Sequence, residues 1–425
     1  MIPQAARIPG ALAPAWGLLG VAFAAVSLWV LAGTHIASPY ADAWEWVAEL
    51  TRLSATGDLA GYLFRPHHGH LLVWTRGLLL VDQTLGGGRN WAFVGVSVVM
   101  LAAVSAALAR TLAREAGASS PGSTVLALFL VWLAPNLLDA GVLINALYVH
   151  GATLSMLALM AWGRPGWGWA LASIALAMLA CLSVAAALAV WPALVLGALQ
   201  ARDWKRLGLA LASGAPVAAL LTMTQLAAVD AVTAGQAALP GLADIATYAL
   251  GYLGLPLTRA SALRGLIAGG GLAVAGIWMI AASLNTPSPL RRLAGGLAMF
   301  SLVTAALAAV GRAGLDGGDI PVRYAMLVTP LHLAVVLWAA DLASKAPVGR
   351  LRWIQGAMLG LGLALLGLQI LVGQALVEVS ARNRALIAAF EAGRRDPAMV
   401  PTVHPDLDHA WRVREDAIRA GVLRP

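Results

Sequence analysis

The first candidates for chemistry are three carboxylates that follow the first long apolar run. In the stretch SPYADAWEWVAEL, Asp42, Glu45 and Glu49 are spaced three and four residues apart, so a helix would carry them on one face. Such an amphipathic helix lies at a membrane surface, where a carboxylate exposed to water can act as a general base. Two purely structural roles are also open: an interfacial anchor whose acids are solvated, and helix capping by Asp42. Asp42 and Glu45 are our candidate catalytic residues.

A histidine-rich segment, RPHHGH, follows at residues 65–70. His67 and His70 are three residues apart, so both could bind a metal together with a carboxylate. Alternatively, they are interfacial histidines that hydrogen-bond to the backbone or to a lipid phosphate. Arg76 lies in the next apolar stretch, where a charge is normally functional or paired. We expect Asp42 or a lipid phosphate as its partner, and we class His67, His70 and Arg76 as candidate substrate-binding residues.

A second group of candidates lies late in the chain, in GRAGLDGGDIPVRY. Arg312 and Arg323 are eleven residues apart at the two ends of a short loop, and Tyr324 follows the second. Two guanidinium groups held in this way suit a phosphate or a pyrophosphate. The alternative is that both arginines pair with Asp316 and Asp319 inside the loop.

Three weaker polar groups complete the inventory. The loop 228–262 predicts an interfacial helix that serves as a lid or an anchor, and a polar patch near Pro135 either lines a cavity or stabilises a broken helix. The C-terminal tail is predicted to be a solvated helix packed on the outer face. The polar residues of the loop are Tyr248, Tyr252 and Arg259. Those of the patch are Asn136, Asp139, Asn145 and His150, and those of the tail are His404, Asp406, Asp408 and His409.

The elements that must position these residues are membrane helices. The chain has 425 residues, of which 60% are hydrophobic and only 11% charged, against about 25% charged in soluble proteins. Apolar runs of about 20 residues recur along it, and the first is longer than a signal-peptide core, which favours an uncleaved anchor. We predict an all-α polytopic protein with about eleven membrane helices, near 13–33, 91–110, 123–134, 142–162, 167–182, 184–200, 207–227, 263–283, 293–311, 324–342 and 353–376.

The charges of the connecting segments predict the orientation. With a cytoplasmic N-terminus, the inner face carries three acids (Glu115, Asp203 and Asp341) and twelve basic residues: Arg7, Arg110, Arg114, Arg164, Arg202, Lys205, Arg206, Arg291, Arg292, Lys345, Arg350 and Arg352. This asymmetry obeys the positive-inside rule. We therefore expect a membrane domain over 1–376, with outer loops 34–90, 228–262 and 312–323, and an outer tail over 377–425.

The same layout excludes several classes of function. The net charge of +8 follows from topology, so it gives no reason to expect nucleic acid as a partner. We find no Walker motif and no GxGxxG in a βαβ context, hence no nucleotide site on the inner face. Cys181 is the single cysteine, so an intrachain disulfide is ruled out. The expected partners are membrane lipid and molecules that reach the outer face.

The order of these motifs resembles the GT-C superfamily of glycosyltransferases, in particular bacterial members that depend on polyprenyl-phosphate sugars. The resemblance rests on YADAW at Tyr40, Asp42 and Trp44, on HHGHL at His67 and His70, on the GR and RY pairs that contain Arg312 and Arg323, and on HP at His404. The family has an acid and a base where Gly69 and Leu71 stand, and a second acid at Ala43.

This resemblance implies a function and a place. The expected enzyme lies in the bacterial inner membrane and transfers a sugar, with inversion, from a polyprenyl-phosphate donor to a glycan or lipid acceptor on the periplasmic face. Asp42 takes the role of the base. The reaction needs no cofactor, although a divalent cation could assist. Two alternatives stay open: a polysaccharide polymerase or ligase that uses lipid-diphosphate-linked glycans, and a lipid flippase or transporter.

Overall fold

The computed structural model describes residues 12–67, 70–117, 120–233, 241–255, 262–313, 320–400 and 402–423. Within these residues the chain is all-α, and the nearest approach to a sheet is an isolated bridge between His67 and His70. The helices are α1 Leu12–Thr34, α2 Ala43–Thr56, α3 Leu59–Phe64, α4 Val73–Val81, α5 Trp91–Ala116, α6 Ser120–Val131, α7 Ala134–Ala140, α8 Leu143–Trp162, α9 Trp167–Cys181, α10 Val190–Ala201, α11 Trp204–Thr233, α12 Leu242–Gly254, α13 Ala262–Ser283, α14 Pro289–Arg312, α15 Ala325–Ser344, α16 Val348–Glu391 and α17 Leu407–Arg419.

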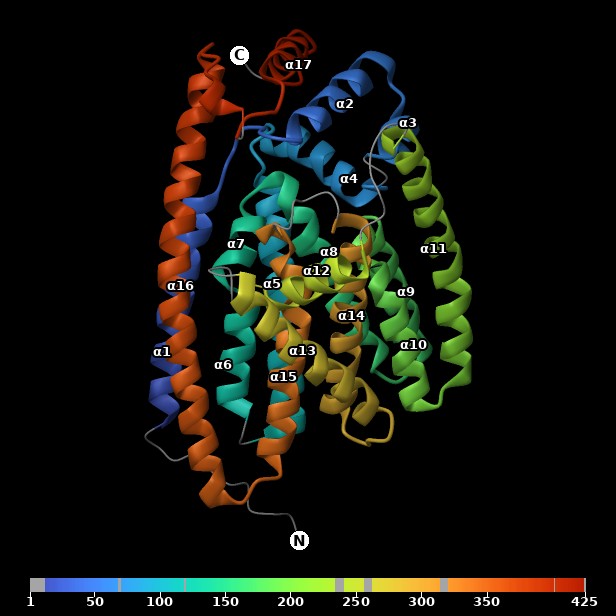
Figure 1. Cartoon of the computed structure of the whole chain (residues 1–425), viewed down its shortest axis with the longest axis vertical. Helices are drawn as coiled ribbons and strands as arrows, with labels where there is room; N and C mark the ends of the chain where they lie inside the picture. The colour runs from blue at the N-terminus through green and yellow to red at the C-terminus, as the bar shows by residue number, and fades with distance from the viewer. Residues whose placement is uncertain are drawn as a thin grey trace.

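The helices form an elongated bundle, and the predicted all-α membrane protein is confirmed (Figure 1). The predicted count of about eleven membrane helices is not confirmed. Seven helices of the described chain are long and apolar enough to cross a bilayer: α1, α5, α11, α13, α14, α15 and α16. The bent pair α6–α7 would make eight. Two of the expected spans became α9 and α10, which have only 15 and 12 residues, whereas about 20 are needed to span the hydrocarbon core.

The break between α6 and α7 is built from polar side chains inside the bundle. The two helices meet at an angle of 46°, with a proline in the first turn of α7. The Asn136 amide donates to the carbonyls of Leu130 and Val131, at 3.0 and 3.2 Å. Gln369 of α16 accepts from the Ala134 N–H at 2.6 Å. These bonds replace the ones that the broken helix lacks, as a backbone away from water requires, so Asn136 has the stabilising role that was one of its two predicted alternatives.

The helix α16 is the longest element and joins the bundle to the tail. Its 44 residues span about 66 Å at 1.5 Å per residue, about twice the hydrocarbon thickness of a bilayer. The boundary predicted at residue 376 therefore falls inside a continuous helix. Arg384 ties the far part of α16 to the end of α1, because its guanidinium donates to the carbonyls of Gly33 and His35 at 2.7 and 3.0 Å.

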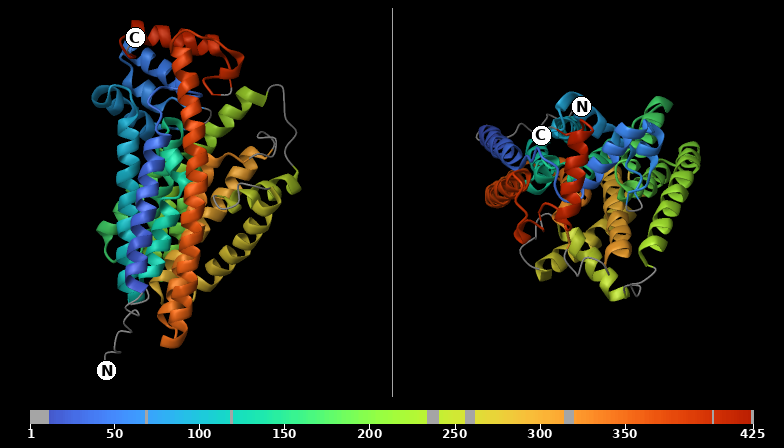
Figure 2. Two further views of the ribbon diagram at one scale, coloured as in Figure 1. Left: turned by 90° about the vertical axis from the view of Figure 1, so that its left-hand side faces the viewer. Right: turned by 90° about the horizontal axis from the view of Figure 1, so that it is seen from above.

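A layer of short helices covers the end of the bundle opposite the start of α1. It consists of α2, α3 and α4, which come from the first predicted outer loop, and of α17 from the tail (Figures 1 and 2). The helix α2 buries one face, with Trp44, Trp46 and Leu50, against the rest of the protein, and α17 packs on α2. We call this layer the cap. The first loop and the tail thus lie at the same end of the molecule.

Candidate functional site

The late arginines of the sequence meet in a group of aromatic side chains. Arg323 lies in a short 3₁₀ turn, Val322–Tyr324, that leads into α15. Its side chain hydrogen-bonds to the side chains of Tyr148 and Tyr324, and its guanidinium carbon lies 5.5 Å from the centre of the Tyr324 ring. Arg312, the last residue of α14, also acts electrostatically on Tyr148. The two predicted phosphate-binding arginines therefore converge on one phenol of α8.

Tyrosines from separate elements surround these two charges. The ring of Tyr324 lies 5.2 Å from that of Tyr148 and 5.6 Å from that of Tyr252 in α12, measured between centroids. Tyr252 is fully buried, and this burial raises the pKa of its hydroxyl well above the ordinary value. We call Arg312, Arg323, Tyr148, Tyr252 and Tyr324 the arginine–tyrosine cluster. It combines fixed positive charge with neutral hydroxyl groups.

The helix α12 reaches the cluster because it runs across the long axis of the molecule (Figure 1). It packs closely on α13 at Gly269, where a Cβ atom would lie 1.7 Å from the carbonyl oxygen of Leu250. Only glycine allows this approach. The structure thus assigns Tyr248 and Tyr252 to the surroundings of the late arginines, while Arg259 of the same predicted loop lies outside the described residues.

The first outer loop extends to the same cluster through Tyr40. Burial raises the pKa of the Tyr40 hydroxyl, the negative charge of Asp139 raises it further, and the positive charge of Arg323 lowers it. These influences place Tyr40 near both charged residues. Asp139 lies in α7 and is completely buried. The sequence order separates these three residues by up to 283 positions, and the fold brings them together.

Asp42 lies two residues after Tyr40, at the start of α2. It occupies the N-cap position, yet its side chain makes no capping hydrogen bond and is exposed. The preceding residue, Ala41, adopts a left-handed conformation with φ of 49°, and its N–H donates to the Val403 carbonyl at 2.6 Å. The capping role considered for Asp42 is therefore not found, and its carboxylate faces solvent at the edge of the cap.

Glu45 lies one turn further along α2 and faces the tail. Its Oε1 atom is 3.0 Å from Nε2 of His409 and 3.6 Å from Nε2 of His404. Aromatic packing holds the tail there: the ring of Phe390 in α16 contacts Trp44 and Trp411, with centroid distances of 5.7 and 5.5 Å. The tail packs on α2 as a helix, as predicted, and the assignment of this end to the outer face stays a prediction.

Arg76 has protein partners of its own. It is 3% exposed and donates to the backbone carbonyls of Tyr62 and Arg65, while burial lowers the pKa of its guanidinium. The carboxylate that acts on it electrostatically is that of Glu49 rather than that of the expected Asp42. Arg76 thus fixes the end of α3 on α4, and the structure does not place it with Arg312 and Arg323.

The two histidines of the first loop form a tight turn. The backbone of His67 pairs with that of His70 through two hydrogen bonds of 2.9 and 2.8 Å. The indole N–H of Trp46 donates to Nε2 of His67 at 3.3 Å. Within the described chain, the group of three potential metal ligands that converges contains Glu45, His404 and His409 instead. His68 and Gly69 lie outside the described residues.

Tyr148 of the cluster and two residues that act on its surroundings, Asp139 and Tyr40, were missed or given little weight in the sequence analysis. Tyr148 is a single tyrosine in an apolar segment and gives no signal by itself. Asp139 was only one member of a polar patch, and Tyr40 entered only as part of a motif. Asp316 and Asp319, the alternative partners of the late arginines, lie outside the described residues.

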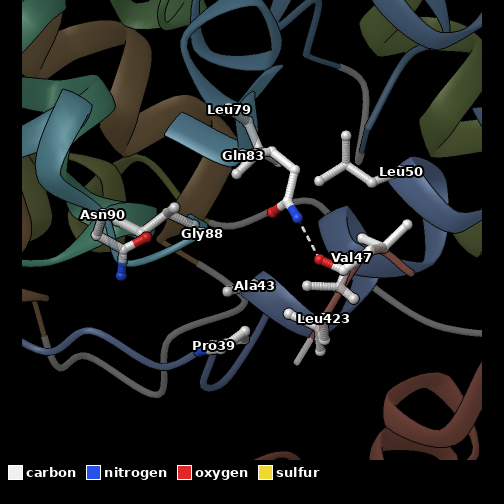
Figure 3. A pocket seen from close by; sticks show the side chains of 11 residues that line it. Pro39, Ala43, Val47, Leu50, Leu79, Gln83, Gly88, Asn90 and Leu423 are labelled. Atoms are coloured by element: carbon white, nitrogen blue, oxygen red, sulfur yellow. Dashed lines mark hydrogen bonds between the residues drawn. The ribbon is translucent and has the colours of Figure 1, made fainter. Parts of the chain in front are cut away.

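A small cavity lies beneath the cap, between α2, α4 and the end of the tail (Figure 3). Its volume is about 20 Å³, enough for about one water molecule. Most of its wall is apolar, and the Gln83 amide at its edge donates to the Val422 carbonyl. The cavity is too small for a sugar or a lipid chain. It lies where the end of the tail contacts the first loop.

No protein-family model and no curated protein matches the chain. The structure is similar to two crystal structures of ArnT from Cupriavidus metallidurans, one in the apo state and one bound to undecaprenyl phosphate. In both cases the identity is 16% and the TM-score 0.49; the matches cover 97% and 95% of this chain and 90% and 89% of the ArnT chains. ArnT is a GT-C glycosyltransferase, the superfamily that the motifs resemble. A likeness at this level leaves the function to be argued from the residues.

Proposed function

We propose that this protein is a membrane-embedded glycosyltransferase that uses a polyprenyl-phosphate-linked sugar as donor. The acceptor is a glycan or a lipid of the cell envelope. The chain lies in the bacterial inner membrane with its N-terminus in the cytoplasm, and the reaction takes place at the cap, on the periplasmic face.

The observation that carries this proposal is the convergence of Arg312 and Arg323 on Tyr148. Guanidinium groups bind phosphate oxygens through paired, charge-assisted hydrogen bonds. Arg323 has phenols as its hydrogen-bonding partners, and within the described residues it has no salt bridge to a carboxylate. A lipid phosphate oxygen would be an anionic ligand for Arg323. The two arginines would also stabilise the charge that grows on the phosphate as it leaves.

The proposed reaction is a single displacement. A hydroxyl oxygen of the acceptor attacks the anomeric carbon and forms the new glycosidic bond, while the bond from that carbon to the phosphate oxygen breaks. Asp42 takes the proton of the attacking hydroxyl, and polyprenyl phosphate leaves with the bonding electrons. The configuration at the anomeric carbon is inverted. Asp42 suits this role because its carboxylate is exposed and makes no capping hydrogen bond.

The apolar exterior of the bundle supports a lipid-linked donor. Large hydrophobic side chains are exposed along the bundle, for example Leu18, Val99 and Ile277, and in a bilayer these contact lipid chains. A polyprenyl tail stays in the bilayer while its phosphate reaches the polar end of the bundle, so no soluble donor-binding domain is needed.

The binding of the donor phosphate tests this proposal. We expect Arg323→Lys to weaken the affinity for polyprenyl phosphate about 10–100-fold, because a lost hydrogen bond to a charged group costs about 1.5–3 kcal/mol. Arg352→Lys is the matched control, since this exposed arginine lies at the start of α16. Binding can be followed with detergent-purified protein and a fluorescent polyprenyl phosphate.

Equal affinity of wild type, Arg323→Lys and the control would contradict the arginine–tyrosine cluster as the phosphate site. Reconstitution in liposomes separates the transferase from a flippase. Lipid movement between leaflets without release of polyprenyl phosphate would favour transport over sugar transfer.

A further inference from the structure

Three potential metal ligands from distant parts of the chain converge between α2 and α17. They are a carboxylate oxygen of Glu45 and the Nε2 atoms of His404 and His409, and all three lie within 4.8 Å of one another. The proposed sugar transfer assigns no role to the two histidines. The tail brings them to Glu45 although they follow it by more than 350 residues.

Asp406 contacts both histidines of this group. Its backbone N–H donates to Nδ1 of His404 at 3.0 Å, and its carbonyl oxygen lies 2.8 Å from the same nitrogen. The Asp406 side chain accepts from the backbone N–H of His409 at 2.9 Å, as the N-cap of α17. Metal binding through Nε2 of His404 requires the tautomer that carries its proton on Nδ1, where the Asp406 carbonyl can accept it.

The distances between these three side chains are compatible with a shared metal ion. Nε2 of His409 is buried and makes no hydrogen bond, although it lies 3.0 Å from the Glu45 oxygen, so that contact lacks the alignment of a hydrogen bond. Zinc bonds of about 2.0–2.2 Å place neighbouring tetrahedral ligands about 3.3–3.6 Å apart. The two measured Glu45–histidine distances of 3.0 and 3.6 Å lie close to this spacing.

We propose that Glu45, His404 and His409 bind a divalent transition-metal ion, with Zn²⁺ as the best match. Two imidazoles and one carboxylate form a set that zinc binds with a fourth position open, whereas Mg²⁺ prefers oxygen ligands and retains its waters. The side chains of His409 and Glu45 are 33% and 39% exposed, against 12% for His404.

This ion links the C-terminal tail to α2, the helix that begins at Asp42. Glu45 and Asp42 lie three residues apart, about one helical turn. A metal bound here holds the start of α2 and leaves Asp42 as the available carboxylate, because Glu45 is engaged as a ligand. The proposal stands on the geometry of the cap and does not depend on the sugar-transfer reaction.

Zinc titration of the full chain tests the site. The protein is purified in detergent without a polyhistidine tag, stripped with a chelator and titrated with Zn²⁺ by calorimetry, and its zinc content is measured by mass spectrometry. We expect one zinc ion per chain, no competition from excess Mg²⁺, and at least about tenfold weaker binding in His409→Ala and in Glu45→Gln. Asp408→Asn is the control, since this exposed carboxylate beside His409 pairs with Arg395 at 2.6 Å.

Trypsin provides a second readout of the link to the tail. Zinc should slow cleavage at Arg412 and Arg414 in α17 of the wild type and leave cleavage unchanged in Glu45→Gln. A wild type without stoichiometric zinc would overturn the proposal, as would equal zinc affinity of wild type and Glu45→Gln. Both results hold even if His409→Ala fails to fold. Loss of polyprenyl-phosphate release with intact zinc binding would instead contradict the sugar-transfer function alone.

Discussion

The surroundings of Arg323 fit its proposed role as a ligand for a phosphate. Its hydrogen-bonding partners are the phenols of Tyr148 and Tyr324, which are neutral and add no fixed negative charge. A carboxylate in that place would have to be separated from the arginine before a phosphate could bind. The buried Asp139 acts electrostatically on Tyr40. Arg323 itself lies beside neutral hydroxyl groups.

His35 predicts how stability depends on pH. Burial lowers the pKa of its imidazole below 6.5, so the folded protein binds this proton less readily than the unfolded chain does. The contribution of His35 to stability is therefore complete above pH 6.5 and is lost as the pH falls from about 6.5 through the folded pKa. We expect the melting temperature of the wild type to fall faster than that of His35→Gln between about pH 6.5 and 5.

Thermal unfolding of both proteins in detergent, at matched ionic strength, gives this comparison directly. Parallel curves for the two proteins would show that His35 has the same pKa in the folded and unfolded states, which would contradict the effect of burial.

At the scale of elements, α12 depends on one close contact with α13. A methyl group at Gly269 would overlap the Leu250 carbonyl, whereas Gly270 has open space at the same place. We expect Gly269→Ala to destabilise the protein by about 1–3 kcal/mol through overpacking. Gly270→Ala should stabilise it by about 0.5–1 kcal/mol, because alanine favours a helix.

Because α12 carries Tyr252, Gly269→Ala should also weaken the binding of polyprenyl phosphate. Melting temperatures and lipid affinities of the two variants test both effects. Equal behaviour of the two alanine variants would mean that α12 is not held at Gly269.

The elements themselves could be predicted where local chemistry decides. The spacing of Asp42, Glu45 and Glu49 predicted the amphipathic α2, and Pro135 predicted the break before α7. The end of α16 could not be found in this way. Alanine, leucine, arginine and glutamate continue the helix after the apolar run ends, since these residues favour helices in water as well as in lipid.

The site was predicted only in part for a related reason. Arg312 and Arg323 bracket a short loop, so their proximity could be read from the sequence. The contact of Arg323 with Tyr148, and of Glu45 with His404, joins residues far apart in the chain, and a single sequence carries no signal for such contacts.

At the scale of the whole molecule, the polar cap and the start of α1 lie at opposite ends of the bundle (Figures 1 and 2). Cys181 is buried, so the wild type should resist a membrane-impermeant maleimide. We expect Asp416→Cys, exposed in α17, to react in cells with a permeabilised outer membrane, and Arg350→Cys to react only after the inner membrane is opened. The reverse pattern would invert the proposed orientation.

We propose that sugar transfer from a lipid phosphate takes place at the cap, with Asp42 as the base. The most direct test measures the release of polyprenyl phosphate by purified wild type and Asp42→Asn, with a panel of polyprenyl-phosphate sugars and a cell-envelope glycan extract. We predict release by the wild type and a loss of at least about 100-fold in Asp42→Asn, with donor affinity unchanged. Wild-type turnover in Asp42→Asn would remove Asp42 from the mechanism, and the absence of release from every donor by the wild type would contradict sugar transfer itself.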